Sequence, residues 1–367
     1  MSWHKMVIKV GTSTLTAGTG QLSAPRMLDL VRQIAALRTQ GTDVVLVTSG
    51  AQQAGRERLG ASCEGQHIPT KQMLAAIGQG RLMHLWDEYF DLYGMLAAQV
   101  LLTRQDIDDR SRYLNVRDTF DSLLERRIVP IVNENDAVAT EEIKVGENDS
   151  LSAMVAILVE ADLLVLLSDI DGLYTADPFH WPEARLIERV EHIDRSIYEL
   201  AGDSRSEYGT GGMYTKIAAA DMATRSGTEV VIANGAREGI LTSLMDRTQP
   251  ATWFPARVTL AEGRKRWLLA QKVVAGMVTI DAGAERAIVS SGRSLLPAGI
   301  LQVTGDFERG AFIGVRTESG EVARGLSNYS SAGICRILGH RSGSIAELLG
   351  YDYGPEVIHR DKMVILS

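Results

Sequence analysis

The most regular feature of the first ~255 residues is an alternation of short apolar runs with longer segments of helical periodicity. The runs are dense in Val, Leu and Ile and do not alternate with polar residues. Runs of this kind are typical of strands buried on both faces of a mostly parallel sheet. We therefore predict six strands, at residues 6–10, 44–47, 97–102, 128–132, 163–167 and 230–233.

Helices are predicted between these strands. Ser23 is the expected N-cap of the first one, with Pro25 in its first turn and apolar residues at helical spacing after it. Further helices are predicted at residues 71–93, 115–126, 150–159 and 216–226. This order of strands and helices predicts an α/β fold, a three-layer α/β/α sandwich around a mostly parallel sheet. Ligands of such sheets bind at the carboxyl ends of the strands.

The pattern changes near residue 260. Glu262–Arg266 is a polar break, and we predict a first domain at 1–258 followed by a linker at 259–273. Short strands with frequent glycine-containing turns follow, which predicts a small β-barrel-like domain at 274–353. Its strands are expected at residues 276–280, 299–303, 311–316 and 322–326. The last segment, 354–367, is predicted to be a C-terminal tail.

Composition limits the classes of function. The chain has 367 residues, which favours about two domains, and 45% hydrophobic and 23% charged residues, which is ordinary for a globular protein. A net charge of −8 argues against general affinity for nucleic acid or anionic membranes. Two distant cysteines, Cys63 and Cys335, cannot form a disulfide framework or a zinc cluster, so a reducing compartment is expected. We recognise no signal peptide or membrane-spanning stretch.

Two glycine–lysine segments far apart in the chain are candidates for binding phosphate. The first contains Lys9, Gly11 and two hydroxyl residues. The second is Thr210-Gly211-Gly212-Met213-Tyr214-Thr215-Lys216, which leads into a predicted helix. Glycine turns that free backbone N–H groups, a helix N-terminus and a nearby ammonium suit a polyphosphate. Neither segment has the P-loop spacing, and together they suggest two walls of one site closing on a phosphoryl group. The alternatives are an edge lysine before a turn and a flexible linker that caps a helix.

Polar clusters follow several of the predicted strands. Ser49 and Gly50 form a strand-to-helix turn that can present N–H groups to a carboxylate. Acid–amide clusters come next, with Asn133 and Asp136 in one and Glu147, Asn148 and Asp149 in the other. They can bind a substrate ammonium, orient a lysine or organise water on Mg²⁺, although turn and N-cap roles remain the alternative. Ser168 and Asp169 follow the strand at 163–167 and are candidates for contact with a nucleotide, or simply part of a tight turn.

The seven histidines lie outside these clusters. If the group that accepts the phosphoryl is a carboxylate, no histidine is needed as a general base. The pKa of a carboxyl group is near 4, so the group is already ionised at neutral pH. Phosphoryl transfer to such an acceptor requires positioning and neutralisation of charge.

Taken together, these segments resemble the glutamate 5-kinases of the amino acid kinase family over the length of the chain. The resemblance rests on VIKVGTS at 7–13, VTSGA at 47–51, VPIVNENDAVA at 129–139, IKVGENDSLSA at 143–153, GLYTADP at 172–178 and GTGGMYTK at 209–216. The last third resembles the PUA domain found in bacterial members, through GRSLLPAGI at 292–300 and VTGDF at 303–307.

The resemblance implies a function and a role for each matching residue. It implies ATP-dependent phosphorylation of the side-chain carboxylate of L-glutamate, with Mg²⁺ held mainly by ATP phosphates and water. The implied catalytic residues are Lys9, Lys216 and Asp149, the last orienting the lysines. The implied glutamate-binding residues are Ser49, Gly50, Asn133, Asp136, Glu147 and Asn148. The implied ATP-binding residues are Lys9, Gly11, Ser168, Asp169, Thr210, Gly211, Gly212, Met213, Tyr214, Thr215 and Lys216.

The resemblance also implies a cytoplasmic homo-oligomer, a dimer or tetramer, that acts in proline biosynthesis and is inhibited by proline. A transient contact with glutamyl phosphate reductase is a further expectation. Two alternatives remain open. One is a related kinase acting on acetylglutamate, aspartate or carbamate, against which the acid–amide clusters and the C-terminal domain speak. The other is RNA binding through the C-terminal domain. Residues 275–353 hold seven Arg, no Lys and eight Asp or Glu, which is a poor electrostatic footprint for RNA.

Overall fold

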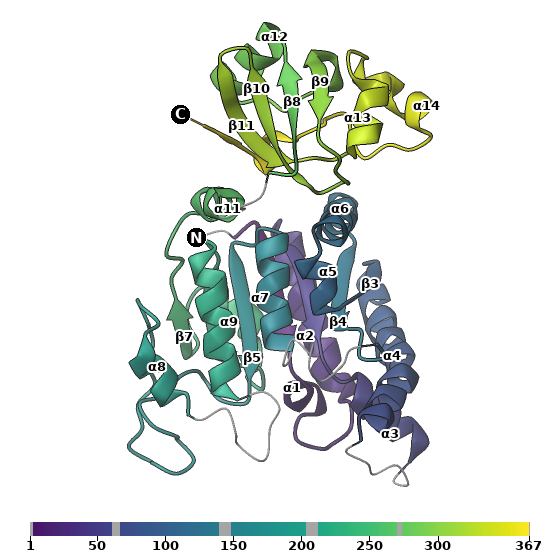
Figure 1. The fold of residues 1–367 in the computed structure, drawn as a ribbon. Helices are drawn as coiled ribbons and strands as arrows, with labels where there is room; N and C mark the ends of the chain where they lie inside the picture. Colours follow the sequence, from purple (N-terminus) through teal and green to yellow (C-terminus); the bar gives the residue numbers. More distant parts are fainter. Residues whose placement is uncertain (1–2, 61–66, 139–147, 203–211, 270–273, 367) are drawn as a thin grey trace. The chain divides into compact units, whose positions relative to one another are not determined.

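The N-terminal part of the chain is built on one seven-stranded sheet (Figure 1). The computed structural model describes residues 3–60, 67–138, 148–202, 212–269 and 274–366. The strands lie in the order β3-β4-β2-β1-β5-β6-β7, and every pair is parallel except β6 with β7. They are β1 Lys5–Val10, β2 Asp43–Thr48, β3 Ala97–Leu102, β4 Val129–Glu134, β5 Leu163–Ser168, β6 Glu229–Asn234 and β7 Ala251–Phe254.

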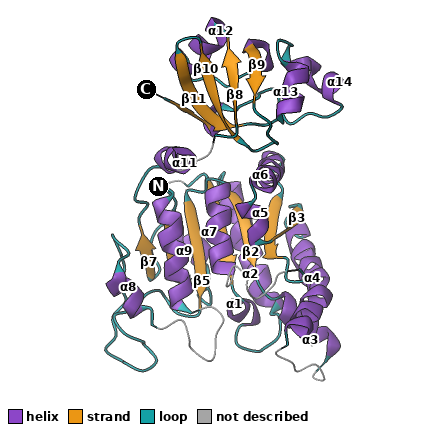
Figure 2. Ribbon diagram, viewed as in Figure 1, coloured by secondary structure: helices purple, strands orange, loops and turns teal. Residues whose placement is uncertain are grey.

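All six predicted strands are confirmed, each within two residues at either end. The seventh, β7, was not predicted, since it is a four-residue edge strand that pairs antiparallel with β6. The fold class is confirmed as well, because helices cover both faces of this mostly parallel sheet (Figure 2).

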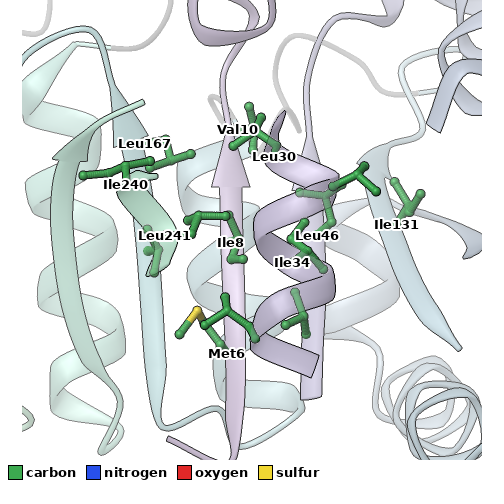
Figure 3. Packing of buried hydrophobic residues seen from close by; sticks show 14 of the residues in the cluster. Met6, Ile8, Val10, Leu30, Ile34, Leu46, Ile131, Leu167, Ile240 and Leu241 are labelled. Atoms are coloured by element: carbon green, nitrogen blue, oxygen red, sulfur yellow. The ribbon is translucent and has the colours of Figure 1, made fainter. Parts of the chain in front are cut away.

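Buried side chains join α2 to one face of the sheet (Figure 3). Strand β1 alternates its side chains between the two faces, as every strand does. Met6, Ile8 and Val10 point to the α2 side, where they pack with Leu30 and Ile34 and are fully buried. Lys9 therefore lies on the opposite face, which helices α7 and α9 cover.

The helices predicted at 71–93, 115–126, 150–159 and 216–226 end within two residues of the predicted limits but begin two to five residues earlier. Pro69, in the first turn, lets α4 begin three residues before the predicted start. The short helices α1, α5, α8 and α10 carry too few residues for a periodic signal. The helices are α1 Thr12–Thr16, α2 Ala24–Thr39, α3 Ala51–Leu59, α4 Ile68–Asp91, α5 Arg104–Asp108, α6 Arg110–Glu125, α7 Asn148–Leu158, α8 Arg195–Leu200, α9 Met213–Arg225 and α10 Ile240–Met245.

The C-terminal residues form a second unit around a five-stranded sheet. Its strands lie in the order β12-β11-β10-β8-β9, with β8 and β10 parallel and the other neighbours antiparallel. They are β8 Gly276–Ile280, β9 Ile300–Thr304, β10 Phe312–Thr317, β11 Gly320–Leu326 and β12 Met363–Ile365, which confirms the four predicted strands. The helices are α11 Leu260–Leu269, α12 Ala282–Glu285, α13 Ser331–Ile337 and α14 Ile345–Leu349.

Two segments differ from the predicted domain plan. Residues 260–269 of the expected linker form helix α11, because good helix formers outweigh the single glycine there. The expected tail contains β12, which pairs with β11 through a run too short to be recognised in the sequence. Contacts divide the chain into residues 1–107 with 116–260 and residues 108–115 with 261–367. The limits 1–258, 259–273, 274–353 and 354–367 themselves stay predictions.

Candidate active site

Two lysines from distant segments meet at one carboxylate. Lys9 is the next-to-last residue of β1, Asp149 lies in the first turn of α7, and Lys216 lies in the first turn of α9. The Lys9 Nζ is 2.6 Å from the Asp149 Oδ1, and the Lys216 Nζ is 3.1 Å from the Oδ2. Asp149 therefore contacts both lysines, and its role in orienting them for catalysis stays a prediction.

This charge cluster is buried. Asp149 is fully buried, and Lys9 and Lys216 are each 5% exposed. Burial alone raises the pKa of the Asp149 carboxyl, but the charges of Lys9 and Lys216 and the hydrogen bonds from Lys9 and Thr215 outweigh it. The pKa of this carboxyl is consequently lowered, and Asp149 is ionised at neutral pH.

The Asp149 carboxylate also connects the N-terminal turns of two helices. The Thr215 Oγ1 lies 2.9 Å from the Asp149 Oδ2 and 2.8 Å from the Gly212 backbone oxygen, and its single proton can be donated to either one. Gly212 is the N-cap of α9 and is exposed. Because helix N-termini carry partial positive charge, α7 and α9 add to the field of the two ammonium groups. The arrangement can neutralise a phosphoryl group that approaches both lysines.

Side-chain amides join the turn after β2 to the end of β4. The Asn148 Nδ2 lies 2.8 Å from the Thr48 backbone oxygen, 2.8 Å from the Ser49 Oγ and 3.0 Å from the Asn133 Oδ1. Gly50, with φ 102°, begins α3 in a conformation that favours glycine. The structure thus brings together four of the six residues expected to bind the acceptor.

The remaining two residues expected to bind the acceptor are Asp136 and Glu147. Asp136 lies in the turn that follows β4 and is half-buried. Glu147 is outside the described residues, as are Thr210 and Gly211 of the expected ATP-binding run. Their roles stay predictions.

The expected nucleotide-binding pair lies at the same sheet edge. Ser168 ends β5, the strand next to β1, and donates from its Oγ to the Asp169 Oδ1 at 3.0 Å. Ser168 is 7% exposed, whereas Asp169 is exposed. Gly11 follows β1 directly and is the N-cap residue of α1.

An aromatic pair extends this region beyond the predicted residues. Met213 and Tyr214 open α9, and the Tyr214 ring is tilted against the Tyr198 ring of α8 with centroids 5.3 Å apart. Tyr214 is 39% exposed. Tyr198 was not singled out in the sequence, because a lone tyrosine on a six-residue helix gives no signal.

A second unpredicted contact holds the loop after Ser168. Arg237, in the turn after β6, donates from Nε and Nη2 to the two carboxylate oxygens of Asp171, both at 2.7 Å. The hydrogen bonds from Arg237 lower the pKa of the Asp171 carboxyl despite partial burial, with the Arg237 charge adding to them. The Asp171-Gly172 turn is therefore fixed by a contact as well as by turn chemistry.

Within the described ranges there is no group of three or more His, Cys, Asp or Glu side chains placed to hold a metal ion. No described helix is long and apolar enough to span a membrane.

Comparison with known protein families agrees with this geometry. The amino acid kinase family matches residues 4–234, and the PUA domain matches residues 276–349. A carbamate kinase from Giardia lamblia, solved with AMP-PNP, is similar in fold, with a TM-score of 0.51 and 16% identity over 70% of this chain and 99% of that chain.

Closer relatives are found by sequence. The chain is 51% identical to glutamate 5-kinase of Herpetosiphon aurantiacus and 50% identical to glutamate 5-kinase of Yersinia pestis, each over 98% of both chains. The chain therefore belongs to the amino acid kinase family and, within it, to the glutamate 5-kinases.

Proposed function

We propose that this protein transfers the γ-phosphoryl group of ATP to the side-chain carboxylate of L-glutamate. The product is L-glutamyl 5-phosphate, the first intermediate of proline biosynthesis. The observation that carries the proposal is the pair of buried lysines on Asp149 at the sheet edge that also holds Ser49, Asn133 and Asn148. Relatives with about half of their residues identical bear the name of this activity.

The reaction needs charge neutralisation and no base. A side-chain carboxylate oxygen attacks the γ-phosphorus, the bond from that phosphorus to the bridging oxygen of ADP breaks, and ADP leaves with the electron pair. The carboxylate is ionised at neutral pH, so no proton has to be removed. Lys9 and Lys216 neutralise the charge that develops on the transferred oxygens, and Asp149 keeps both ammonium groups in place.

Magnesium fits this site as a partner of the nucleotide. Both oxygens of Asp149 already contact lysine, so this carboxylate is not offered as a metal ligand. Mg²⁺ in kinase sites is held largely by phosphate and water oxygens. When bound it neutralises phosphate charge, and the chain's own contribution is to position the acceptor and the two cations.

The proposal has a direct test. Purified protein with Mg-ATP is assayed for ADP release with L-glutamate, acetylglutamate or aspartate, with hydroxylamine present to trap an acyl phosphate as the hydroxamate. We expect turnover and hydroxamate with L-glutamate. Turnover with another acceptor alone would keep the roles of the lysines and overturn the substrate.

Several finer properties rest on the family resemblance. We extend the proposal to inhibition by proline, homo-oligomerisation and a cytoplasmic location, and to transient contact with glutamyl phosphate reductase. Adding proline to the same assay tests the first, and sedimentation tests the second. RNA binding is not favoured, since residues 275–353 carry more acidic than basic side chains.

A further inference from the structure

Gln79, on helix α4, contacts the amide network of the acceptor site. Its Oε1 accepts a hydrogen bond from the Asn133 Nδ2 at 2.8 Å, and Asn133 is 2% exposed. The Asn133 Oδ1 in turn faces the Asn148 Nδ2 at 3.0 Å. Three side-chain amides from α4, β4 and α7 therefore form one chain of hydrogen bonds.

The direction of this chain is fixed at its far end by a backbone carbonyl. The Thr48 backbone oxygen can only accept, so Asn148 must turn its NH₂ group toward it. The two N–H bonds of Asn148 face three acceptors, the Thr48 oxygen, the Ser49 Oγ and the Asn133 Oδ1. Asn133 thus turns its Oδ1 toward the NH₂ group of Asn148 and its own NH₂ group toward Gln79. The Asn133 NH₂ group then needs a hydrogen-bond acceptor at residue 79, and the Gln79 Oε1 supplies it. If Asn133 rotated by half a turn, its NH₂ group would face the NH₂ group of Asn148.

Helix α4 packs closely against α3, the helix that follows Ser49 and Gly50. A Cβ added at Gly78 would lie 1.8 Å from the Ala51 backbone oxygen, and one at Gly55 would lie 2.1 Å from the Leu74 backbone oxygen, so α3 and α4 are in close backbone contact. Farther along α4, the Trp86 Nε1 donates to the Thr48 Oγ1 at 3.2 Å. Gln79 is thus carried by a helix that packs closely against α3 and bonds to the last residue of β2.

We propose that Gln79 is a positioning residue that fixes the orientation of Asn133 and, through it, of Asn148. The inference rests on the proposed function, because the orientation matters for binding the acceptor. With its NH₂ group turned inward, Asn148 keeps its Oδ1 for a hydrogen-bond donor on the ligand, such as the ammonium of glutamate. The Gln79 Nε2 is buried and has no hydrogen-bond partner among the described residues, so the hydrogen bond that this side chain makes in the network is the one its acceptor oxygen receives.

The test compares Gln79→Met, which removes the acceptor and roughly keeps the shape, with Gln99→Met, an exposed glutamine on β3. Glutamate-dependent ADP release is measured at varied glutamate and at varied ATP. Because an amide loses its buried partner, we expect Gln79→Met to raise the KM for glutamate about tenfold or more. The KM for ATP should stay within about twofold, as should both constants of Gln99→Met.

A double variant separates positioning from direct contact. If Gln79 acts through Asn133, Gln79→Met should change the glutamate KM less than about twofold once Asn133→Ala is present. If the two substitutions instead raise the glutamate KM by factors that multiply in the double variant, the inference is overturned. A loss confined to kcat would overturn it as well, and either result would leave the proposed function intact. Absence of glutamate-dependent turnover in the wild-type protein would instead refute the proposed function, and this inference with it.

The wild type, Gln79→Met, Asn133→Ala and the double variant also form a double-mutant cycle in the free energy of unfolding. This measurement does not depend on enzyme turnover. Coupling between Gln79 and Asn133 is expected there too, and its absence would contradict the hydrogen bond itself. Gln79→Leu replaces Gln79→Met if the latter does not fold.

Discussion

Replacing Asp149 by asparagine removes the one charge that the two buried lysines share. At an effective dielectric constant of about 20, unit charges ~4 Å apart attract by about 4 kcal/mol, and Asp149 makes two such pairs. Desolvation offsets most of this attraction, and removing one partner of a buried ion pair costs about 3–5 kcal/mol. We therefore expect Asp149→Asn to lower the free energy of unfolding at pH 7 by about 3–5 kcal/mol.

The loss of stability in Asp149→Asn should depend on pH and should become smaller in acid. The pKa of Asp149 in the folded protein lies below its ordinary value of 3.8, so the carboxylate stabilises the fold above that value. This contribution disappears as the pH falls from about 4 through the lower pKa of the folded state. The difference between wild type and variant should thus be constant from pH 7 to about pH 5 and should shrink below pH 4.

Urea unfolding followed by tryptophan fluorescence measures these differences. Four of the five tryptophans (Trp3, Trp86, Trp181 and Trp253) lie in the unit that holds the site. Asp246→Asn, at an exposed position that ends α10, is the control and should change little. A loss under about 1 kcal/mol at pH 7, or one that does not shrink in acid, would refute the shared-charge reasoning.

Three further predictions follow from the same structure. Lys9→Met and Lys216→Met should each lower kcat/KM about 10²–10³-fold in the ADP-release assay, because each removes a charge that stabilises the transition state. Losses under tenfold in both variants would contradict a site with two cations. Gly78→Ala should cost about 1–3 kcal/mol in urea unfolding, since its Cβ would overlap α3, whereas Gly80→Ala, with open space around it, is the control. Arg237→Gln should raise the pKa of the Asp171 carboxyl, as measured by carboxyl NMR. It should lower the free energy of unfolding by only about 1 kcal/mol, because the pair is partly exposed. An unchanged pKa would argue against the contact.

The sequence was sufficient for the main layers of the fold. Unbroken apolar runs such as Leu163–Leu167 are distinctive because a strand covered on both faces is built mainly of apolar residues. Strands β7 and β12 were missed for the opposite reason: they have four and three residues, and pairing with a neighbour stabilises them more than their own pattern does.

The sequence indicated which residues are candidates for the site, but it did not predict which of them contact one another. Glycine and lysine at 9–11 and 212–216 indicated phosphate binding, but the sequence gives no distance between Lys9 and Lys216. Only the sheet order, with β1 in its centre, brings them to one carboxylate. Gln79 was missed because one glutamine on a long amphipathic helix has no local signature, and its role arises from partners on other elements.

The most direct test of the account follows the oxygen atom of the acceptor. L-glutamate labelled with ¹⁸O in its side-chain carboxylate is incubated with Mg-ATP, the protein and hydroxylamine, which attacks the acyl carbon and releases phosphate. If the carboxylate attacks the γ-phosphorus, each released phosphate should carry one ¹⁸O, with one hydroxamate formed per ADP. Phosphate without label would mean that water is the acceptor, and it would contradict phosphoryl transfer to glutamate at this site.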